Sequence, residues 1–175
     1  LATIDSGIET IGVALGAEAE ATTLRTEIKS TLDQIRAAVE PFERPKVFIV
    51  MSRERGDLSN LQTVGGGSFI SELVTIAGGD NIYEEEKSPY LEASKETLLI
   101  REPDVILEIH AGSTFTENQT VALLSDWRFL DSLPAWKGKR IYFFTDSLMM
   151  RPGPRVPEIA KQIARKLHFD AQLPE

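Results

Sequence analysis

Three short apolar runs, separated by stretches with helical patterning, restrict the fold of this chain more than any other feature. The runs are residues 46–51 (KVFIVM), 104–110 (DVILEIH) and 140–145 (RIYFFT). Short runs rich in β-branched and aromatic residues, bounded by Pro or Gly, are typical of buried strands. Strands that alternate with helices form a parallel sheet with helices on both of its faces. The sequence therefore predicts an α/β fold with three layers, αβα, and a mostly parallel sheet.

A long amphipathic helix is predicted ahead of the first strand, from about Ala17 to Glu40, and Pro41 ends it. At 1.5 Å per residue such a helix is about 36 Å long, which is more than a short α/β crossover requires. We therefore expect it to brace the whole domain. Its apolar residues recur at spacings of three and four: Ala21, Leu24, Ile28, Leu32, Ile35 and Val39.

Shorter helices are predicted between and after the strands. Their signals are apolar residues at helical spacing, a capping box at Thr116 and Gln119, and Gly or Pro at the ends. The segments are 69–77, 94–101, the stretch that follows Thr116, 127–133 and 156–167. Residues 52–60 are polar and are predicted to form a loop.

Composition excludes several classes of function. The chain has 27 Asp and Glu against 19 Lys and Arg, a net charge of −8 that repels a phosphate backbone, so we expect no nucleic-acid partner. Cysteine is absent, which excludes thiol catalysis and Cys-based zinc or iron–sulfur sites. No apolar run approaches the roughly 18 residues of a membrane span. The first residues lack the basic and apolar regions of a signal peptide.

Candidate ligand contacts follow the predicted strands. Ser52 opens the loop after the first strand, His110 ends the second, and Arg151 lies in a Pro-rich loop after the third. Ligands of open α/β sheets bind outside the carboxyl ends of the strands. The alternatives remain open: His110 as a hydrogen-bonded structural residue, and Arg151 as a solvated or helix-capping charge.

The triple glycine around Gly66 opens the predicted helix 69–77. It lacks the spacing of a phosphate-binding loop or a dinucleotide fingerprint. Two interpretations remain, a turn that needs positive φ angles and a close approach of the backbone to a ligand. His168, near the end of the last helix, is expected to be a cation that suits the helix dipole. Residues 84–86 (EEE) are expected to form a solvated acidic loop, and Trp127 and Trp136 to pack in the interior.

No hydrolase elbow, kinase signature or zinc motif is present. The chain is therefore not expected to be an enzyme. A catalytic α/β domain that uses a metal or a nucleotide is the alternative.

Taken together, these elements resemble the helical-backbone substrate-binding proteins of ABC importers, the family of cobalamin, iron–siderophore and haem receptors. Six pieces occur in the order of the family: 65–73, 77–82, 94–99, 102–107, 133–142 and 151–155. Members of this family have two α/β lobes joined by one long helix, and the ligand binds in the cleft between the lobes.

The resemblance implies how the chain is divided. Residues 1–42 would be a hinge segment and the interlobe helix, and residues 43–175 the C-terminal lobe. The first lobe, a signal peptide and any lipid anchor would lie upstream of Leu1, and the protein would be periplasmic or extracytoplasmic. The helix at 17–40 would leave an apolar stripe uncovered where the first lobe sits, and self-association through that helix or the cleft face is expected.

The resemblance also implies a function, the binding of a metal chelate (an iron–siderophore, cobalamin or haem) for delivery to an ABC permease in the membrane. No cofactor and no resident metal site are expected. The segments around Ser52, Gly66, His110 and Arg151 fall on the rim of the cleft in this fold, and Tyr90 would stack on the ligand. Arg151 would pair with ligand carboxylates, or His110 would approach the metal of the chelate.

In this family a glutamate early in a short helix docks onto arginines of the permease, and Glu96 is the matching residue here. Its alternative is an ordinary first-turn acid that the helix dipole stabilises. A third reading is a signalling domain that keeps the fold and has lost transport.

Overall fold

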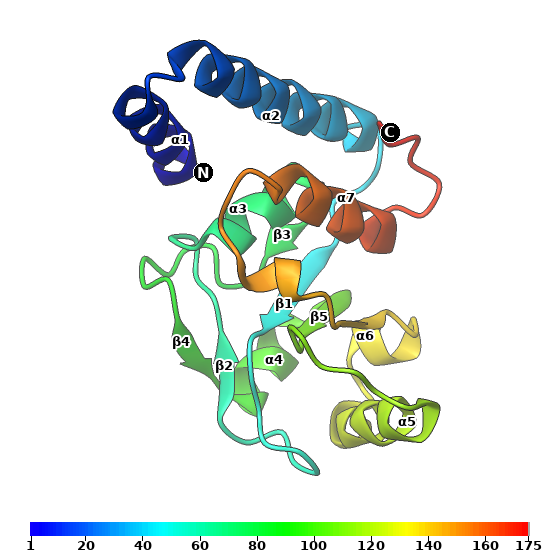
Figure 1. Cartoon of the computed structure of the whole chain (residues 1–175). Helices are drawn as coiled ribbons and strands as arrows, with labels where there is room; N and C mark the ends of the chain where they lie inside the picture. Colours follow the sequence, from blue (N-terminus) through cyan, green and yellow to red (C-terminus); the bar gives the residue numbers. More distant parts are fainter. Residues whose placement is uncertain (175) are drawn as a thin grey trace.

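An open sheet of four parallel strands forms the centre of the computed structural model, which describes residues 1–174 (Figure 1). The strands lie in the order β3 (Asp80–Asn81), β1 (Lys46–Val50), β5 (Val105–Ile109) and β6 (Ile141–Phe144). Every neighbouring pair is parallel. The three predicted strands are all present, and their parallel pairing confirms the predicted α/β class.

Helices cover both faces of the sheet. The central strands β1 and β5 have apolar residues on both faces, and Glu108 is the exception among their buried residues. In β1, Val47 and Ile49 face a core that includes α2 (Glu18–Val39), α3 (Phe69–Ile76) and α7 (Val156–Leu167). Phe48 and Val50 face a second core that includes α4 (Lys95–Arg101), the 3-10 helix η1 (Trp127–Leu130) and α6 (Pro134–Lys137). Helix α5 (Glu117–Asp126) precedes η1 directly. This is the predicted αβα arrangement of three layers.

The predicted long helix is α2, which lies across α3 and α7 on one side of the domain (Figure 1). Its apolar residues face inward, with Leu32, Ile35 and Val39 buried. The prediction of an apolar stripe along this helix is wrong, because no large apolar side chain of α2, which lies wholly within the described residues, is exposed.

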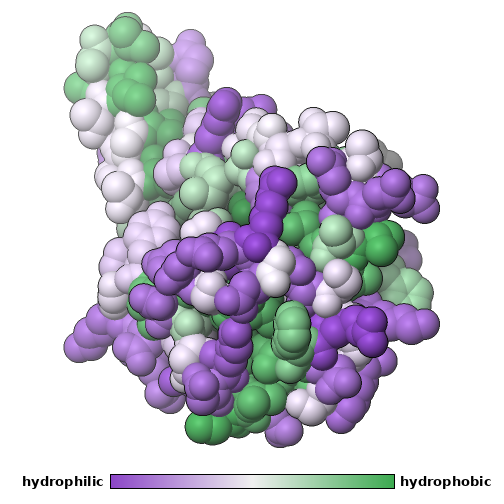
Figure 2. Space-filling model, turned by 90° about the horizontal axis from the view of Figure 1, so that it is seen from below, coloured by the Kyte–Doolittle hydropathy of each residue, from purple (hydrophilic) through white to green (hydrophobic). Residues whose placement is uncertain are grey.

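Exposed apolar residues occur instead on α1 (Ala2–Leu15), a helix that the sequence analysis did not predict. Ile11, Val13 and Leu15 are each more than half exposed. In Figure 2, which views the molecule from below, the apolar surface of this region is seen at the distant upper left. Gly12 is buried where α1 crosses α2, since a methyl group there would overlap with the side chain of Ala21.

A second, smaller sheet lies beside the loop that follows β1. Strands β2 (Leu61–Thr63) and β4 (Leu91–Ala93) pair antiparallel, and Ser52 forms a bridge to Gln62. Neither strand was predicted, because three residues are too short for an alternating pattern to be recognised. The polar segment 52–60 is a loop except for this bridge, as predicted.

Side-chain caps begin three of the helices, and the predicted capping box is one of them. Ser68, Ser94 and Thr116 accept hydrogen bonds from backbone N–H groups of the first turns, and Thr116 and Gln119 form a complete capping box. A further 3-10 helix, η2 (Ser147–Met150), links β6 to the loop before α7. Across residues 1–174, none of the helices has the length and apolar character to cross a membrane.

His168 differs from its expectation. It is only 6% exposed, packs beside Phe42, and its Nε2–H donates to the carbonyl of Gly78 at 3.1 Å. Burial lowers the pKa of His168, and the charges of Arg140 and Arg44 act in the same direction. The expected cation at the end of the last helix is therefore disfavoured, and His168 is a buried structural residue.

Candidate functional site

The carboxyl ends of β1, β5 and β6 meet at one edge of the sheet. Val50 lies opposite Glu108, and Ile109 lies opposite Phe144. The backbone N–H of His110 donates to the carbonyl of Phe144 at 2.7 Å, which continues the pairing for one residue past β5. This register places the segments that begin at Ser52, His110 and Thr145 along one edge.

An ion pair lies buried beneath this edge. The Nε–H of Arg53 donates to Oε1 of Glu108 at 2.9 Å, and only 1% of either side chain is exposed. The indole Nε1–H of Trp127 donates to the other carboxylate oxygen at 2.9 Å. The guanidinium carbon of Arg53 also lies 5.8 Å from the centre of the Trp127 ring. Glu108 is thus the one charged residue of an otherwise apolar strand, and it is fully paired.

Arg53 also connects the loop after β1 to α5. Its Nη1 donates to Asp126 Oδ2 at 2.7 Å, and its Nη2 donates to the carbonyl of Leu123 at 3.1 Å. The same oxygen of Asp126 accepts the backbone N–H of Gly56 at 3.1 Å. These hydrogen bonds hold the 52–60 loop in place on its inner side. The residues on its outer side are exposed.

His110 belongs to this network. Its Nε2 lies 2.7 Å from Oε1 of Glu108, and 17% of its side chain is exposed. Phe115 meets the imidazole edge-on with ring centres 5.0 Å apart, and the Phe143 ring lies 6.1 Å away. His110 is therefore both hydrogen-bonded and partly accessible at the edge of the sheet.

The structural reason for the glycines at 65–67 differs from both interpretations of the sequence. None of the three has a positive φ angle, so the positive-φ interpretation is wrong. A methyl group on Gly65 would overlap with backbone oxygens of Glu86 and Ser88, and one on Gly66 with that of Glu84. Because the glycines have no side chains, the 84–88 segment of the same chain can pack closely against them. The backbone N–H of Gly66 donates to the carbonyl of Glu86 in that segment at 3.0 Å.

Tyr90 follows that same segment and is 55% exposed. The hydroxyl of Ser88 donates to the carbonyl of Tyr90 at 2.6 Å. Because the segment rests on the glycines, the structure brings Gly66 and Tyr90 into one region. Glu84 differs from its neighbours in the acidic loop, since its carboxylate accepts the hydroxyl of Ser71.

Ser52 and Arg151 are both exposed. The carbonyl of Ser52 accepts the backbone N–H of Gln62 at 2.9 Å, and the backbone N–H of Arg151 donates to the carbonyl of Leu148 at 2.9 Å. Near Arg151, the backbone N–H of Leu148 lowers the pKa of Asp146, and the Arg151 charge contributes in the same direction. The side chain of Arg151 is thus a solvated charge on the segment after β6.

Glu96 is exposed in the first turn of α4. The backbone N–H of its own residue and the hydroxyl of Ser94 lower the pKa of its carboxyl, which is therefore ionised at neutral pH. The neighbouring cations are engaged elsewhere. Lys95 pairs with Asp57 at 3.0 Å, and Arg101 donates to the carbonyl of Ile82 and lies over the Tyr83 ring. Within residues 1–174, no basic side chain pairs with Glu96.

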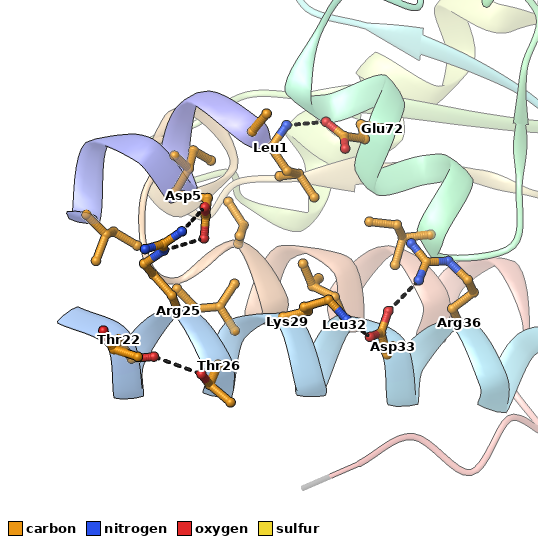
Figure 3. Close-up of a pocket in the computed structure, with 16 residues that line it drawn as sticks. Leu1, Asp5, Thr22, Arg25, Thr26, Lys29, Leu32, Asp33, Arg36 and Glu72 are labelled. Carbon is orange, nitrogen blue, oxygen red and sulfur yellow. Dashed lines mark hydrogen bonds and ion pairs between the residues drawn. The ribbon is translucent and has the colours of Figure 1, made fainter. Parts of the chain in front are cut away.

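A hollow lies away from the strand ends, between α1, α2 and α3 (Figure 3). It has a volume of about 740 Å³, and apolar side chains such as Ile4, Ile28 and Leu32 line it beside charged ones. Arg25 spans the hollow from α2 to Asp5 of α1 with a bidentate contact of 2.7 and 2.8 Å. This ion pair links the two helices across the hollow, and the sequence patterns did not predict it.

Arg53 and Glu108 are the site residues that sequence reasoning missed. A signal was present, because a glutamate in a buried strand requires a partner of opposite charge. The partner itself could not be identified without the fold, since Arg53 and Arg55 are equivalent candidates in sequence. Among the described residues, no group of three or more His, Asp or Glu side chains is arranged to hold a metal ion.

The fold and the open edge define an α/β lobe with candidate ligand contacts at its strand ends. The chain belongs to the periplasmic binding protein family, whose family model matches residues 2–148.

Two curated relatives and one solved structure illustrate the similarity. The vitamin B12-binding protein of Vibrio parahaemolyticus is 22% identical over 146 residues, which are 83% of this chain and 48% of that protein. The high-affinity heme uptake system protein IsdE of Staphylococcus aureus is 30% identical over 110 residues, 62% of this chain and 36% of that protein. An ABC transporter substrate-binding protein from Listeria monocytogenes superposes with a TM-score of 0.80 at 24% identity, over 97% of this chain and 65% of that one. The chain thus spans half or less of the length of these curated relatives.

Proposed function

We propose that this chain is part of the substrate-binding component of an ABC importer for a metal chelate, namely an iron–siderophore, cobalamin or haem. The component captures the chelate, releases it unchanged to a membrane permease, and catalyses no reaction. The family match over residues 2–148 carries this proposal. The names of the vitamin B12 and heme relatives support the class of ligand.

The division of the chain is part of the proposal. Residues 1–42 form a hinge segment and the interlobe helix, and residues 43–175 form the C-terminal lobe. The greater length of the curated relatives supports a first lobe upstream of Leu1. The protein acts in the periplasm or another extracytoplasmic space, where a lipid anchor upstream of this chain would hold it to the membrane.

The ligand wall of this lobe consists of Ser52, Gly66, Tyr90, His110 and Arg151. The exposed Tyr90 ring supplies a flat apolar face for a macrocycle or an aromatic chelator. Arg151 supplies a solvated guanidinium, which pairs well with carboxylates of the ligand. The exposure of both side chains on segments next to the sheet edge supports this assignment.

Docking on the permease is assigned to Glu96. Its carboxylate is exposed, is ionised at neutral pH, and forms no salt bridge among the described side chains, because Lys95, whose charge helps to lower the Glu96 pKa, pairs with Asp57, and Arg101 donates to a carbonyl. An unpaired rim charge steers association with a partner of opposite charge, in a salt-dependent manner. Arginines on the permease would supply that charge.

The test uses the full-length protein with its permease in liposomes. The loaded protein is expected to stimulate ATP hydrolysis by the transporter, and Glu96→Arg is expected to weaken the stimulation while leaving ligand affinity unchanged. Glu117→Arg is the matched control, since Glu117 is also an exposed first-turn glutamate, on α5. Absence of stimulation by the wild type would contradict the transport function. Equal effects of the two variants, or loss of ligand affinity in Glu96→Arg, would contradict the docking role.

We also propose self-association through an exposed helix or the cleft face. The exposed side chains of Ile11 and Leu15 support it, since residues four apart share one face of α1 and neighbouring apolar residues on a surface mark interaction sites. Sedimentation velocity at increasing concentrations of the 175-residue chain tests this. A dimer that an Ile11→Ser change weakens is expected, and a monomer at all concentrations would contradict the proposal.

A further inference from the structure

We propose that Glu108 is a positioning residue: it holds the proton of neutral His110 on Nε2 and so presents the unprotonated Nδ1 as an electron-pair donor at the edge of the sheet. The use of Nδ1 for ligand binding rests on the proposed function above. The assignment of the proton does not, and it can be tested without any ligand.

The first step is that the Glu108 carboxylate only accepts hydrogen bonds. Arg53 forms an ion pair with it, and an ionised carboxylate has no proton to donate. Its three contacts are Arg53 Nε at 2.9 Å, Trp127 Nε1 at 2.9 Å and His110 Nε2 at 2.7 Å. The first two nitrogens are always donors. The third must therefore be protonated too, which leaves the lone pair of neutral His110 on Nδ1.

The second step is that the carboxylate cannot turn to accommodate the other tautomer. Its two oxygens are held by side chains from different parts of the fold, Arg53 from the loop after β1 and Trp127 from η1. Arg53 is itself held by Asp126 and by the carbonyl of Leu123. A rotation of Glu108 would break at least one contact that is buried, and an unpaired buried polar group costs about 1–3 kcal/mol.

The third step is that Nδ1 is accessible. Among the described residues it has no hydrogen-bond partner, and it is absent from the buried polar atoms that lack one. The edge-on contact with Phe115 limits rotation of the ring. A partly exposed imidazole with a fixed proton is thus pre-arranged toward a group that accepts an electron pair, either an open coordination position of a metal chelate or an N–H or O–H group.

The decisive experiment is ¹⁵N NMR of the full-length protein with labelled histidine, recorded as a pH series whose alkaline end is used to assign the tautomer. His110→Gln identifies the His110 signals. The wild type is expected to show the Nε2–H tautomer of His110. Glu108→Gln leaves one amide oxygen as the acceptor for the N–H groups of Arg53, Trp127 and His110. The new amide N–H₂ group is a donor, and it favours an unprotonated Nε2 as its acceptor. A shift of His110 toward the Nδ1–H tautomer is therefore expected.

Asp126→Asn is the matched control. It removes a largely covered carboxylate that contacts Arg53 and leaves Glu108 and His110 in place, so the Nε2–H tautomer should persist. Should Glu108→Gln fail to fold, Glu108→Asp keeps the charge and withdraws it from the ring, and a mixture of tautomers is expected. A wild-type signal of the Nδ1–H form, or an unchanged tautomer in a folded Glu108 variant, would overturn the inference.

Haemin and metal-free protoporphyrin IX test the use of Nδ1. Glu108→Gln is expected to lower the affinity for haemin about tenfold, the size expected when a residue that orients a ligand contact is removed. In the double variant, this loss should not add to the loss caused by His110→Gln. A loss confined to haemin indicates contact with the metal, and an equal loss for both probes indicates a hydrogen bond. Additive losses would overturn the coupling between the two residues. If the wild type binds neither probe, the ligand class of the proposed function is wrong, while the NMR result still decides the tautomer.

Discussion

The side chains of Arg53 and Glu108 form an ion pair of 2.9 Å although 55 residues separate them in sequence, and each is only 1% exposed. The pair connects the loop after β1 to the carboxyl end of β5. Because both charges have left water, each depends on the other for its compensation.

Replacement of Arg53 by Met is expected to destabilise the protein strongly. It leaves the Glu108 carboxylate buried without its ion-pair partner, and breaking a buried pair in this way costs about 3–5 kcal/mol. Urea unfolding measures the loss. Arg36→Met is the control, since the Arg36–Asp33 pair is half exposed and such surface pairs contribute little to stability. Losses of similar size in the two variants would contradict the role assigned to the buried pair.

Gly66→Ala should also destabilise the fold. The added methyl group would overlap with the backbone oxygen of Glu84, and forcing extra volume into a packed site typically costs about 1–3 kcal/mol. Thermal unfolding provides the measurement, with Gly153→Ala as the control, since no atom lies within 4 Å of a methyl group there. If Gly66→Ala proved as harmless as Gly153→Ala, the 84–88 segment would not lie against the glycines as described.

Stability should depend on His168 at mildly acidic pH. Burial lowers its pKa in the folded state below the ordinary value of 6.5, so the unfolded chain binds more protons between these two pKa values. Its contribution is thus complete above pH 6.5 and decreases as the pH falls through that window.

His168→Gln removes the titrating group and can keep the hydrogen bond to the carbonyl of Gly78. The free energy of unfolding of the wild type, minus that of the variant, should therefore decrease as the pH falls below 6.5. Urea titrations at several pH values test this. A difference that stays constant with pH would show that His168 is not held neutral by burial.

Much of the fold followed from the sequence, because its strong elements carry local signals. The runs at 46–51, 104–110 and 140–145 are apolar on both faces, as expected for strands of a parallel sheet that is covered on both sides. In α2, apolar residues recur at helical spacing over many residues. Helix α1 was missed, since much of its apolar surface is exposed and its packing against α2 depends on Gly12. Strands β2 and β4 were missed because they are stabilised by each other, across about 30 residues, rather than by their own pattern.

The candidate site was predictable only in outline. Placing Ser52 and His110 at one edge required only the rule that parallel strands end together. The partners of His110 could not be predicted, since Glu108, Arg53 and Trp127 come together through three different elements. The role of the glycines at 65–67 depended on a contact with the 84–88 segment, which has no signal in the sequence.

Absorbance titration of the full-length protein with haemin, cyanocobalamin and a ferric hydroxamate siderophore tests the central proposal most directly. Saturable binding of at least one of these chelates at one molecule per protein is expected, with the chelate recovered chemically unchanged. Tyr90→Ala and Arg151→Ala should weaken that binding, and Lys137→Ala, exposed at the end of α6 near the amino end of β6, should not. A folded protein that binds none of the three chelates, or that converts one of them to a product, would contradict the proposed function.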